Sequence, residues 1–471
     1  MGDREQKSGE FPLSQVERLI ALNARYRDAL SRRKEEGFIK EYLKGFKKFS
    51  IDSDPQRKLT FVPFPMLFPA SFVDEMSTAG ETLLNCQRKI IKNYIGRYTR
   101  EEICRRLGLG PKVVPYMDWD MLVSDTSPVV RFDFLFNAAG SLSFCEFNVD
   151  TSVGGAESYR IAELFMEYSP PAAADILRPG GYVHHPYEDL ARMLEDRCER
   201  FNADRVVFLG WDLKDVYCLG WDTILAKVKE ELPSREVVLL DRESYLADIR
   251  QRSAAGNEHK DVVYRIFIWP QVMNDPFFLE AVRSNSFCTV TMFESLLLLS
   301  KVWFALFHEA DTKELLSSED LLCIERYIPR SVVVTEENIA GLLRDKGRYM
   351  FKEAFSFGGA GVISGRDLDE RTFAGTFEKA SPNRWIAQEF LPQPEIPVMT
   401  GDDLSVMRQK TVFGLYGFSG RYSGLLVRSG TDSDVLNVKT GASMGWTLAL
   451  EDKDAAALID SLERPEHKTA L

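Results

Sequence analysis

Apolar residues recur along the chain with two periods, and helical spacing dominates the N-terminal quarter. Between residues 13 and 109, apolar side chains return every three or four positions, as at Val16, Leu19 and Ile20. That spacing places them on one face of a helix and predicts a mostly helical region. Prolines between residues 63 and 69 interrupt the pattern, and a further helical stretch follows them.

The second period is the alternation of a β-strand. Val129–Phe136 alternates apolar and polar residues, Asn137–Gly140 has the composition of a turn, and Leu142–Val149 supplies a returning strand. These three segments predict a β-hairpin with one face against a core.

Short apolar runs in the middle of the chain predict a small sheet. Val206–Gly210, Val237–Asp241 and Val262–Ile266 have the composition of strands, and Thr223–Glu231 lies between the first two as a helix. This rhythm favours a small parallel α/β unit. The apolar run Phe293–Phe307 is expected to form one buried helix.

The last third of the chain is richer in strand formers and glycine. Tyr349–Lys352 and Trp385–Phe390 are expected as strands, Gly358–Gly365 as a glycine-containing segment between them, and Met407–Leu450 as a strand-rich end. Because one hydrophobic core rarely grows past about 250–300 residues, 471 residues leave room for two or three packed units. The chain is therefore predicted to be a mixed α/β protein with several subdomains.

Composition excludes several classes of protein. With 45% hydrophobic and 28% charged residues, the chain resembles a soluble globular enzyme. Its net charge of -12 argues against a nucleic-acid partner.

No signal peptide is visible and the apolar runs are too short to span a bilayer, so a cytoplasmic protein without a membrane partner is expected. Seven cysteines without a Cys-x-x-Cys pair indicate reduced thiols, not a zinc site or a disulfide framework.

The most informative motifs lie on the predicted hairpin. Residues two apart on a strand share a face, so Arg131 pairs with Asp133 and Glu146 with Asn148. Two carboxylates and an amide oxygen form a hard-oxygen site that suits Mg²⁺ beside nucleotide phosphates. Asp133, Glu146 and Asn148 are therefore the predicted metal ligands, and Arg131 could hold a phosphoryl group. The alternative is a solvated charged face of a hairpin.

Two lysines could neutralise phosphates. Lys301 lies within an apolar run, where a lysine is costly unless it is paired or reaches an anion; a lysine extending to solvent at a helix edge is the alternative. Lys352 ends a short strand just before a glycine cluster. Glycine-rich backbone can offer N–H groups to phosphates, although such a cluster is more often a turn. The glycines predicted to cover the phosphates are Gly358, Gly359 and Gly361.

A strand end further along offers a contact for the nucleoside. Gln388, Glu389, Phe390 and Leu391 close the predicted strand. A carboxylate followed by an apolar hinge could bind ribose and adenine through side chain and main chain. An ordinary strand end is the alternative.

In this order, the motifs resemble those of the circularly permuted ATP-grasp family that contains glutathionylspermidine synthase. In ordinary ATP-grasp enzymes the two nucleotide lysines precede the Glu-x-Asn motif. Here Glu146-x-Asn148 precedes both Lys301 and Lys352, which is the permuted order. The resemblance covers roughly residues 111–450.

Further matches to this family lie later in the chain. Asp261–Arg265 resembles its D-x-x-Y-R strand, and Arg428 and Asn437 stand where its late arginine and asparagine lie. The resemblance implies that Arg131 stabilises transferred charge. Arg265, Arg408 and Arg428 are candidates for holding the carboxylate substrate, and a structural salt bridge is the alternative for each of them.

The resemblance also implies a division of the chain. We expect a mostly helical N-terminal region at 1–110, the metal-binding hairpin part of the ATP-grasp core at 111–195 and a small α/β substrate-side subdomain at 196–290. A nucleotide-binding helix and glycine-loop lid follow at 291–398, and strands at 399–471 complete the core. The Cys-His amidase domain of some family members is not expected, because the N-terminal helices lack a plausible nucleophile.

The activity implied by the family is ATP-dependent ligation. Mg²⁺ and ATP would activate a small-molecule carboxylate as an acyl phosphate, and an amine would then attack to form an amide or peptide bond with release of ADP and phosphate. Two alternatives remain at this point. The acid could be loaded onto the thiol of a carrier protein, or the chain could be a non-catalytic nucleotide-binding relative.

Overall fold

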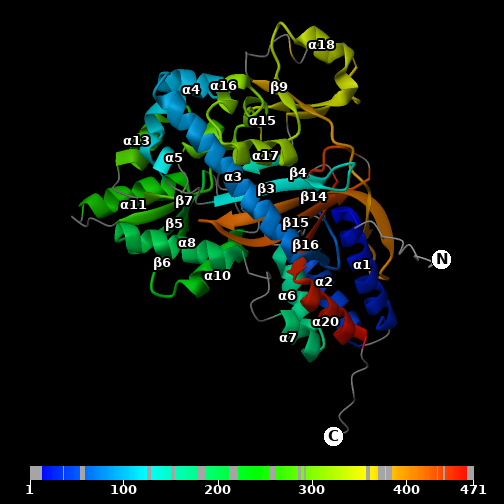
Figure 1. Ribbon diagram of the computed structural model, residues 1–471. Helices are drawn as coiled ribbons and strands as arrows, with labels where there is room; N and C mark the ends of the chain where they lie inside the picture. The colour runs from blue at the N-terminus through cyan, green and yellow to red at the C-terminus, as the bar shows by residue number, and fades with distance from the viewer. Residues whose placement is uncertain are drawn as a thin grey trace, which may run out of the picture.

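The computed structural model describes residues 13–34, 37–53, 59–124, 129–149, 154–155, 158–177, 186–211, 221–254, 260–284, 288–290, 293–356, 361–369, 377, 384–431, 433–438 and 441–463. These residues form a mixed α/β fold built on three sheets, with helices packed around them (Figure 1). The mixed α/β class expected from the sequence is confirmed. Within these ranges, no helix combines the length and apolarity needed to cross a membrane.

The largest sheet has eight strands and brings together distant parts of the chain. Its main path is β1-β16-β15-β14-β3-β4, with β2 also paired to β16 and β13 to β14. The pairs are antiparallel except that β1 and β2 run parallel to β16. The N-terminal region thus contributes two strands that the helical pattern did not predict. The strands are β1 Thr60–Phe61, β2 Met66–Pro69, β3 Val129–Phe136, β4 Leu142–Asn148, β13 Ile396–Met399, β14 Val406–Phe418, β15 Arg421–Gly430 and β16 Ser443–Leu450.

The second sheet is parallel and has the order β6-β5-β7-β8. Its strands are β5 Arg205–Leu209, β6 Glu236–Leu240, β7 Asp261–Arg265 and β8 Cys288–Thr289, and the helices beside them are α8 Pro186–Phe201, α10 Trp221–Glu231 and α11 Arg242–Ala254. The three strands expected in this part of the sequence therefore pair in parallel. A partly buried network in which Arg205 and Arg252 share the carboxylates of Asp248 and Asp261 ties α11 to this sheet.

The third sheet is antiparallel and has the order β11-β10-β12-β9. Its strands are β9 Ser331–Val333, β10 Tyr349–Glu353, β11 Val362–Ser364 and β12 Trp385–Glu389. Helix α18 Ile339–Arg344 packs on it through a small apolar cluster that includes Leu342, Phe351 and Trp385. We refer to this sheet as the lid sheet.

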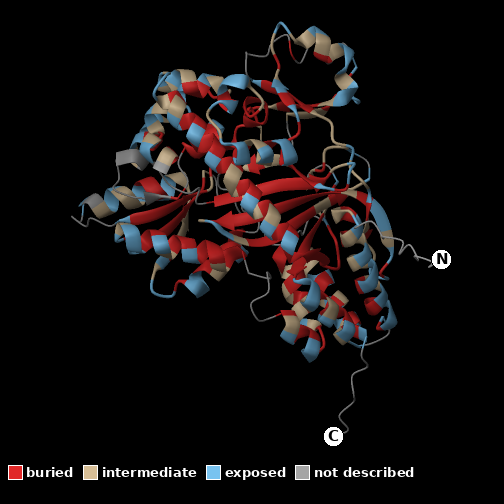
Figure 2. Cartoon of the chain, viewed as in Figure 1, coloured by how far each residue is buried: buried red, intermediate tan, exposed pale blue. Residues whose placement is uncertain are grey.

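Several of the remaining helices, among them α1, α3, α6, α17 and α20, pack against the large sheet, whose strands are buried along much of their length (Figure 2). The long helix α3 approaches β3 closely, since a Cβ at Gly80 would lie 2.2 Å from the Phe132 ring. The remaining helices are α1 Gln15–Arg32, α2 Gly37–Ser53, α3 Ala70–Ile95, α4 Arg100–Arg106, α5 Trp119–Ser124, α6 Tyr159–Tyr168, α7 Pro171–Leu177, α12 Trp269–Val272, α13 Pro276–Ser284, α16 Ala310–Lys313, α17 Ser318–Tyr327 and α20 Asp452–Glu463, with 3₁₀ turns η1 Pro111–Tyr116 and η3 Lys346–Arg348.

The prediction of a single buried helix at Phe293–Phe307 was wrong. The structure has two short helices, α14 Ser295–Leu299 and α15 Trp303–Leu306, separated by a break at Ser300. The Ser300 hydroxyl donates to the Leu107 carbonyl at 2.7 Å, and the Lys301 N–H donates to the Ala354 carbonyl at 3.1 Å. Tertiary hydrogen bonds therefore replace helical ones here and turn Lys301 out of the apolar run.

Candidate functional site

A cavity of about 760 Å³ lies between the large sheet and the lid sheet. Of the residues singled out in the sequence, ten line it: Arg131, Glu146, Lys301, Lys352, Gln388, Glu389, Phe390, Leu391, Arg428 and Asn437. A larger and more open hollow of about 920 Å³ lies along α3 and α17, but none of these residues borders it. The cavity between the sheets is therefore the candidate functional site.

The hairpin of β3 and β4 forms one wall of the cavity and carries the predicted motifs in register. Arg131 lies opposite Asn148, and Asp133 lies opposite Glu146. The register then shifts, so that Phe134 lies opposite Phe144 and Cys145 is an extra residue on β4. A bulge of this kind re-aims side chains, and both Cys145 and Glu146 line the cavity.

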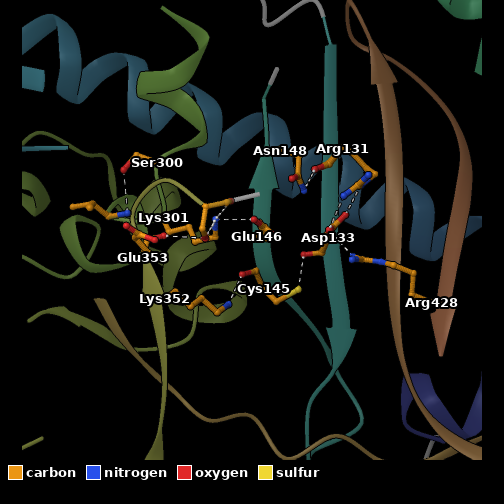
Figure 3. A network of polar contacts seen from close by, with 12 residues as sticks. Arg131, Asp133, Cys145, Glu146, Asn148, Ser300, Lys301, Lys352, Glu353 and Arg428 are labelled. Carbon is orange, nitrogen blue, oxygen red and sulfur yellow. Dashed lines mark hydrogen bonds and ion pairs between the residues drawn. The ribbon is translucent and has the colours of Figure 1, made fainter. Parts of the chain in front are cut away.

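Asp133 lies beneath two arginines and is fully buried. Arg131 donates to it in bidentate fashion, from Nε to Oδ1 at 2.8 Å and from Nη2 to Oδ2 at 3.1 Å. Arg428, on β15, donates from Nη2 to Oδ2 at 2.6 Å (Figure 3). Burial alone would raise the pKa of Asp133, but the two guanidinium charges outweigh burial and hold this pKa below its usual value. The predicted role of Asp133 as a metal ligand does not fit this geometry, because its oxygens already bind two cations.

Gly414 on β14 makes this arrangement possible, because β14 lies between the strands that carry the two arginines. A Cβ at this position would lie 3.0 Å from both Arg131 Cδ and Asp133 Oδ1. The absence of a side chain therefore lets Arg131 and Arg428 meet over the strand between them.

A valine at position 414 is expected to lower the free energy of unfolding by about 1–3 kcal/mol, as overpacking of a filled site does. Urea denaturation followed by circular dichroism would measure this loss. Gly110→Ala is the control, since a Cβ there meets nothing within 4 Å. Equal unfolding midpoints for Gly414→Val and the wild type would contradict the proposed role of Gly414.

Lys301 projects from the break between α14 and α15 toward the other end of the hairpin. Its Nζ lies 2.9 Å from Glu146 Oε1 and donates to the Ser356 carbonyl at 2.9 Å. The lysine is only 2% exposed. Because the helix breaks at this point, its side chain can extend to the Glu146 carboxylate and does not have to reach solvent. Asn148, two residues after Glu146, donates to the Arg131 carbonyl at 3.3 Å and does not line the cavity.

Lys352 reaches the same region from β10. Its Nζ donates to the Cys145 carbonyl at 2.7 Å and lies 5.9 Å from the centroid of the Phe304 ring. Burial lowers the pKa of Lys352, while the neighbouring Glu146 favours its charged form. Burial also raises the pKa of Cys145 to about 12, so this thiol stays protonated and is not a nucleophile near neutral pH.

The end of β12 forms the wall of the cavity on the lid sheet. Gln388 lies opposite Met350 across the strands and shares its face, and both residues line the cavity. The Gln388 Nε2 atom is buried and has no hydrogen-bond partner among the described residues. Phe390 is held by a hydrogen bond from its N–H to the Arg348 carbonyl at 2.7 Å, and the Arg366 guanidinium lies 3.7 Å from its ring centroid.

Several predicted residues lie elsewhere. Arg265 is fully buried at the end of β7, where it donates to the Phe267 carbonyl at 2.5 Å and lies over the Phe293 ring, and it does not line the cavity. Arg408 donates to the Glu395 carbonyl on the exposed side of β14. Gly358 and Gly359 lie outside the described residues. Gly361 has φ +73° and accepts the Glu353 N–H at 2.8 Å, but it does not line the cavity either.

Two polar residues of the cavity were not predicted. Gln393 has a buried Oε1 without a partner in the described part of the chain. Asp434 accepts from Lys410 at 2.5 Å and from Ser364 of the lid sheet at 3.5 Å. Both stand in loops without a motif, so no sequence signal marked them. Asn437, which the family resemblance did include, also lines the cavity.

The cavity offers few ligands for a metal ion. Within the described ranges, no group of three or more His, Cys, Asp or Glu side chains could hold a metal by itself. Of the three predicted metal ligands, Asp133, Glu146 and Asn148, Glu146 lines the cavity. Such a donor set fits Mg²⁺ that shares most of its coordination with phosphates and water.

Comparisons with known proteins show the fold. No family model and no curated protein matches the chain. Among solved structures, the chain is similar to a glutathione synthetase-like effector from Globodera pallida in its apo form, with a TM-score of 0.53 and 12% identity over 93% of this chain and 98% of the other. At that identity the similarity establishes a shared fold and nothing about activity.

A second solved structure is a protein from Methylobacillus flagellatus provisionally named gamma-glutamylcysteine synthetase. It has a TM-score of 0.37 and 11% identity over 81% of this chain and 94% of the other. At that TM-score the similarity carries no argument.

Proposed function

We propose that the protein is an ATP-dependent carboxylate–amine ligase of the ATP-grasp type, with its segments in the circularly permuted order. The observation that carries the proposal is the convergence of Lys301, Lys352, Glu146 and two arginines on one cavity between two sheets. Two lysines from the later part of the chain and a carboxylate about 150 or more residues before them would meet there around a polyphosphate. The shared fold with a glutathione synthetase-like protein supports the proposal without identifying the substrates.

The residues of the cavity fit a nucleotide. Lys352 is a buried cation that donates to a carbonyl oxygen, so a phosphate would supply the full negative charge that a buried ammonium group needs. Gln388, whose Nε2 atom has no hydrogen-bond partner in the described part of the chain, lines the same cavity as the apolar side chains of Leu135, Val412 and Leu436, where an adenine ring could lie. Glu146 would hold Mg²⁺ together with phosphate oxygens and water.

The proposed reaction follows from this placement. An oxygen of the substrate carboxylate attacks the γ-phosphorus of ATP, the bond to the bridging oxygen of ADP breaks, and an acyl phosphate results. An amine nitrogen then attacks the acyl carbon, loses a proton and expels phosphate. Arg131 and Arg428, fixed by Asp133, face the cavity where the negative charge of the carboxylate and phosphoryl group would gather. Lys301 and Lys352 would neutralise the phosphates.

Lys352→Met is expected to weaken the binding of Mg²⁺ with a non-hydrolysable ATP analogue by about tenfold to a hundredfold, because hydrogen bonds to charged groups contribute about 1.5–3 kcal/mol. Isothermal titration calorimetry would measure the two affinities. Lys44→Met, on the exposed face of α2, changes the net charge equally and is expected to bind as the wild type does. Unchanged affinity in Lys352→Met would contradict the nucleotide site.

The activity can be tested before the amine is known. Hydroxylamine captures acyl phosphates as hydroxamates, so a panel of carboxylates with Mg²⁺, ATP and hydroxylamine would report carboxylate activation by hydroxamate colour and ADP release. ADP release that depends on the carboxylate supports the proposal. Nucleotide binding without such release would indicate a non-catalytic relative. Acid recovered on the thiol of a carrier protein would indicate the loading reaction.

A further inference from the structure

A second cavity, of about 670 Å³, lies on the far side of the lid sheet. It is bounded by the end of α17, the segment that leads from α17 into β9, and the strands β10 and β12. Its volume is within the range of about 300–1,000 Å³ that is usual for small-molecule sites. Neither the family resemblance nor the proposed ligase reaction assigns it a role.

Strand geometry explains why the two cavities lie back to back. Met350, Lys352 and Gln388 point to the face that lines the first cavity. Their neighbours point the other way, because successive residues of a strand alternate between faces. Tyr349 and Ala387 accordingly line the second cavity. Glu389, at the end of β12, borders both.

The floor of the second cavity is apolar. Ile324, Ile328 and Ala387 are buried there, and Val332 on β9 is 45% exposed. An exposed valine on a concave surface offers contact area to an apolar group of a ligand.

The rim is positively charged, although the chain as a whole carries a net charge of -12. Lys313, Arg330 and Arg348 line it, and their side chains make no ion pair within the described residues. They outnumber the carboxylates of Glu325 and Glu389. The positive charges also act on His308 in the same cavity. Its pKa is lowered mainly by burial and further by the charges of Lys313 and Arg330.

We propose that this second cavity binds a small organic anion, in which a carboxylate, phosphate or sulfonate contacts Arg330 and Arg348 and an apolar group lies on Ile324, Ile328 and Val332. The two arginines are well placed for one ligand. Their backbone carbonyls accept from Glu389 and Phe390, at 2.7 Å each, so they flank the end of β12 on its two sides. Because those contacts use the backbone, the guanidinium groups are available to an anion with planar, bidentate geometry.

The probe for this site is 8-anilinonaphthalene-1-sulfonate, an aromatic sulfonate whose fluorescence rises in an apolar environment. Titrations are made with the full chain in saturating Mg²⁺ and non-hydrolysable ATP analogue, so that the cavity on the other face of the lid sheet is occupied. The test variant is Arg330→Glu with Arg348→Glu. The matched control is Arg344→Glu, an exposed arginine of α18 that does not line the cavity.

The wild type and the control are expected to bind the probe saturably with equal affinity, and the double variant about tenfold or more weakly. If the double variant does not fold, Val332→Asp provides a second test, because it places a negative charge on the exposed part of the floor and is also expected to weaken binding. Probe binding that survives in these variants, or that the ATP analogue abolishes in the wild type, overturns the proposal.

Discussion

Asp133→Ala is expected to lower the free energy of unfolding by about 3–5 kcal/mol, the usual cost of removing one partner from a buried ion pair. The carboxylate is fully buried and receives three hydrogen bonds from Arg131 and Arg428. Without it, two guanidinium groups that are 14% and 18% exposed would lose the carboxylate that both of them bind. Urea denaturation followed by circular dichroism would measure the loss.

An exposed aspartate provides the control for this measurement. Asp452, 80% exposed, pairs with Arg18 at 3.3 Å, and Asp452→Ala is expected to change the stability by less than about 1 kcal/mol. Similar effects of the two substitutions would show that Asp133 does not hold the arginines.

The pH dependence of this effect has a definite sign. Because the folded protein holds the pKa of Asp133 below its usual value, folding favours the ionised form. The stabilisation is therefore complete above about pH 5, where the carboxyl is ionised in the unfolded chain as well, and it is lost as the pH falls toward the folded-state pKa. The stability difference between the wild type and Asp133→Asn should accordingly shrink as the pH is lowered below 5. A difference that does not change with pH would contradict this assignment.

Arg131→Ala is expected to lower turnover in the hydroxamate assay by a factor on the order of a hundred or more, since loss of one contact to developing charge typically costs about 2.7–4 kcal/mol of barrier. Arg131 is held by Asp133, by the Gly154 carbonyl at 3.3 Å and by the nearby Tyr416 ring. A guanidinium fixed in this way needs little reorganisation to meet a phosphoryl group. Glu146→Ala is expected to have an effect of the same order through the loss of the magnesium ligand.

Arg408→Ala is the control for turnover. Arg408 belongs to the same sheet and also donates to a backbone carbonyl, but it lies outside the cavity. It is expected to keep normal turnover. Normal turnover in Arg131→Ala as well would remove Arg131 from the proposed mechanism, and a loss in all three variants would point to a general loss of folding.

The sequence was sufficient where structure depends on neighbours along the chain. The hairpin of β3 and β4 follows from period-two alternation and from the turn at Asn137–Gly140, where Gly140 has φ +72°. The parallel unit around β5 follows from short apolar runs separated by helical spacing. In both cases the local order of apolar and polar residues predicts which side chains are buried.

Local pattern was insufficient where both sides of a segment are buried. The run Phe293–Phe307 is apolar throughout, so no periodicity marked the break at Ser300. The strands β1 and β2 are short and were hidden among helices, because their pairing partner β16 lies at the other end of the chain.

The sequence by itself determined which chemistry is present: two lysines, a Glu-x-Asn pair and an Arg-x-Asp pair on elements of recognisable type. Only the tertiary structure decided which of these charged groups pair with one another. It directed Lys301 to Glu146 and Lys352 to a carbonyl, and it placed Asp133 between two guanidiniums, one of them 295 residues away in the chain. The physical reason is that secondary structure depends on residues a few positions apart, whereas the charge balance of a buried carboxylate depends on every group that folding brings within a few ångströms.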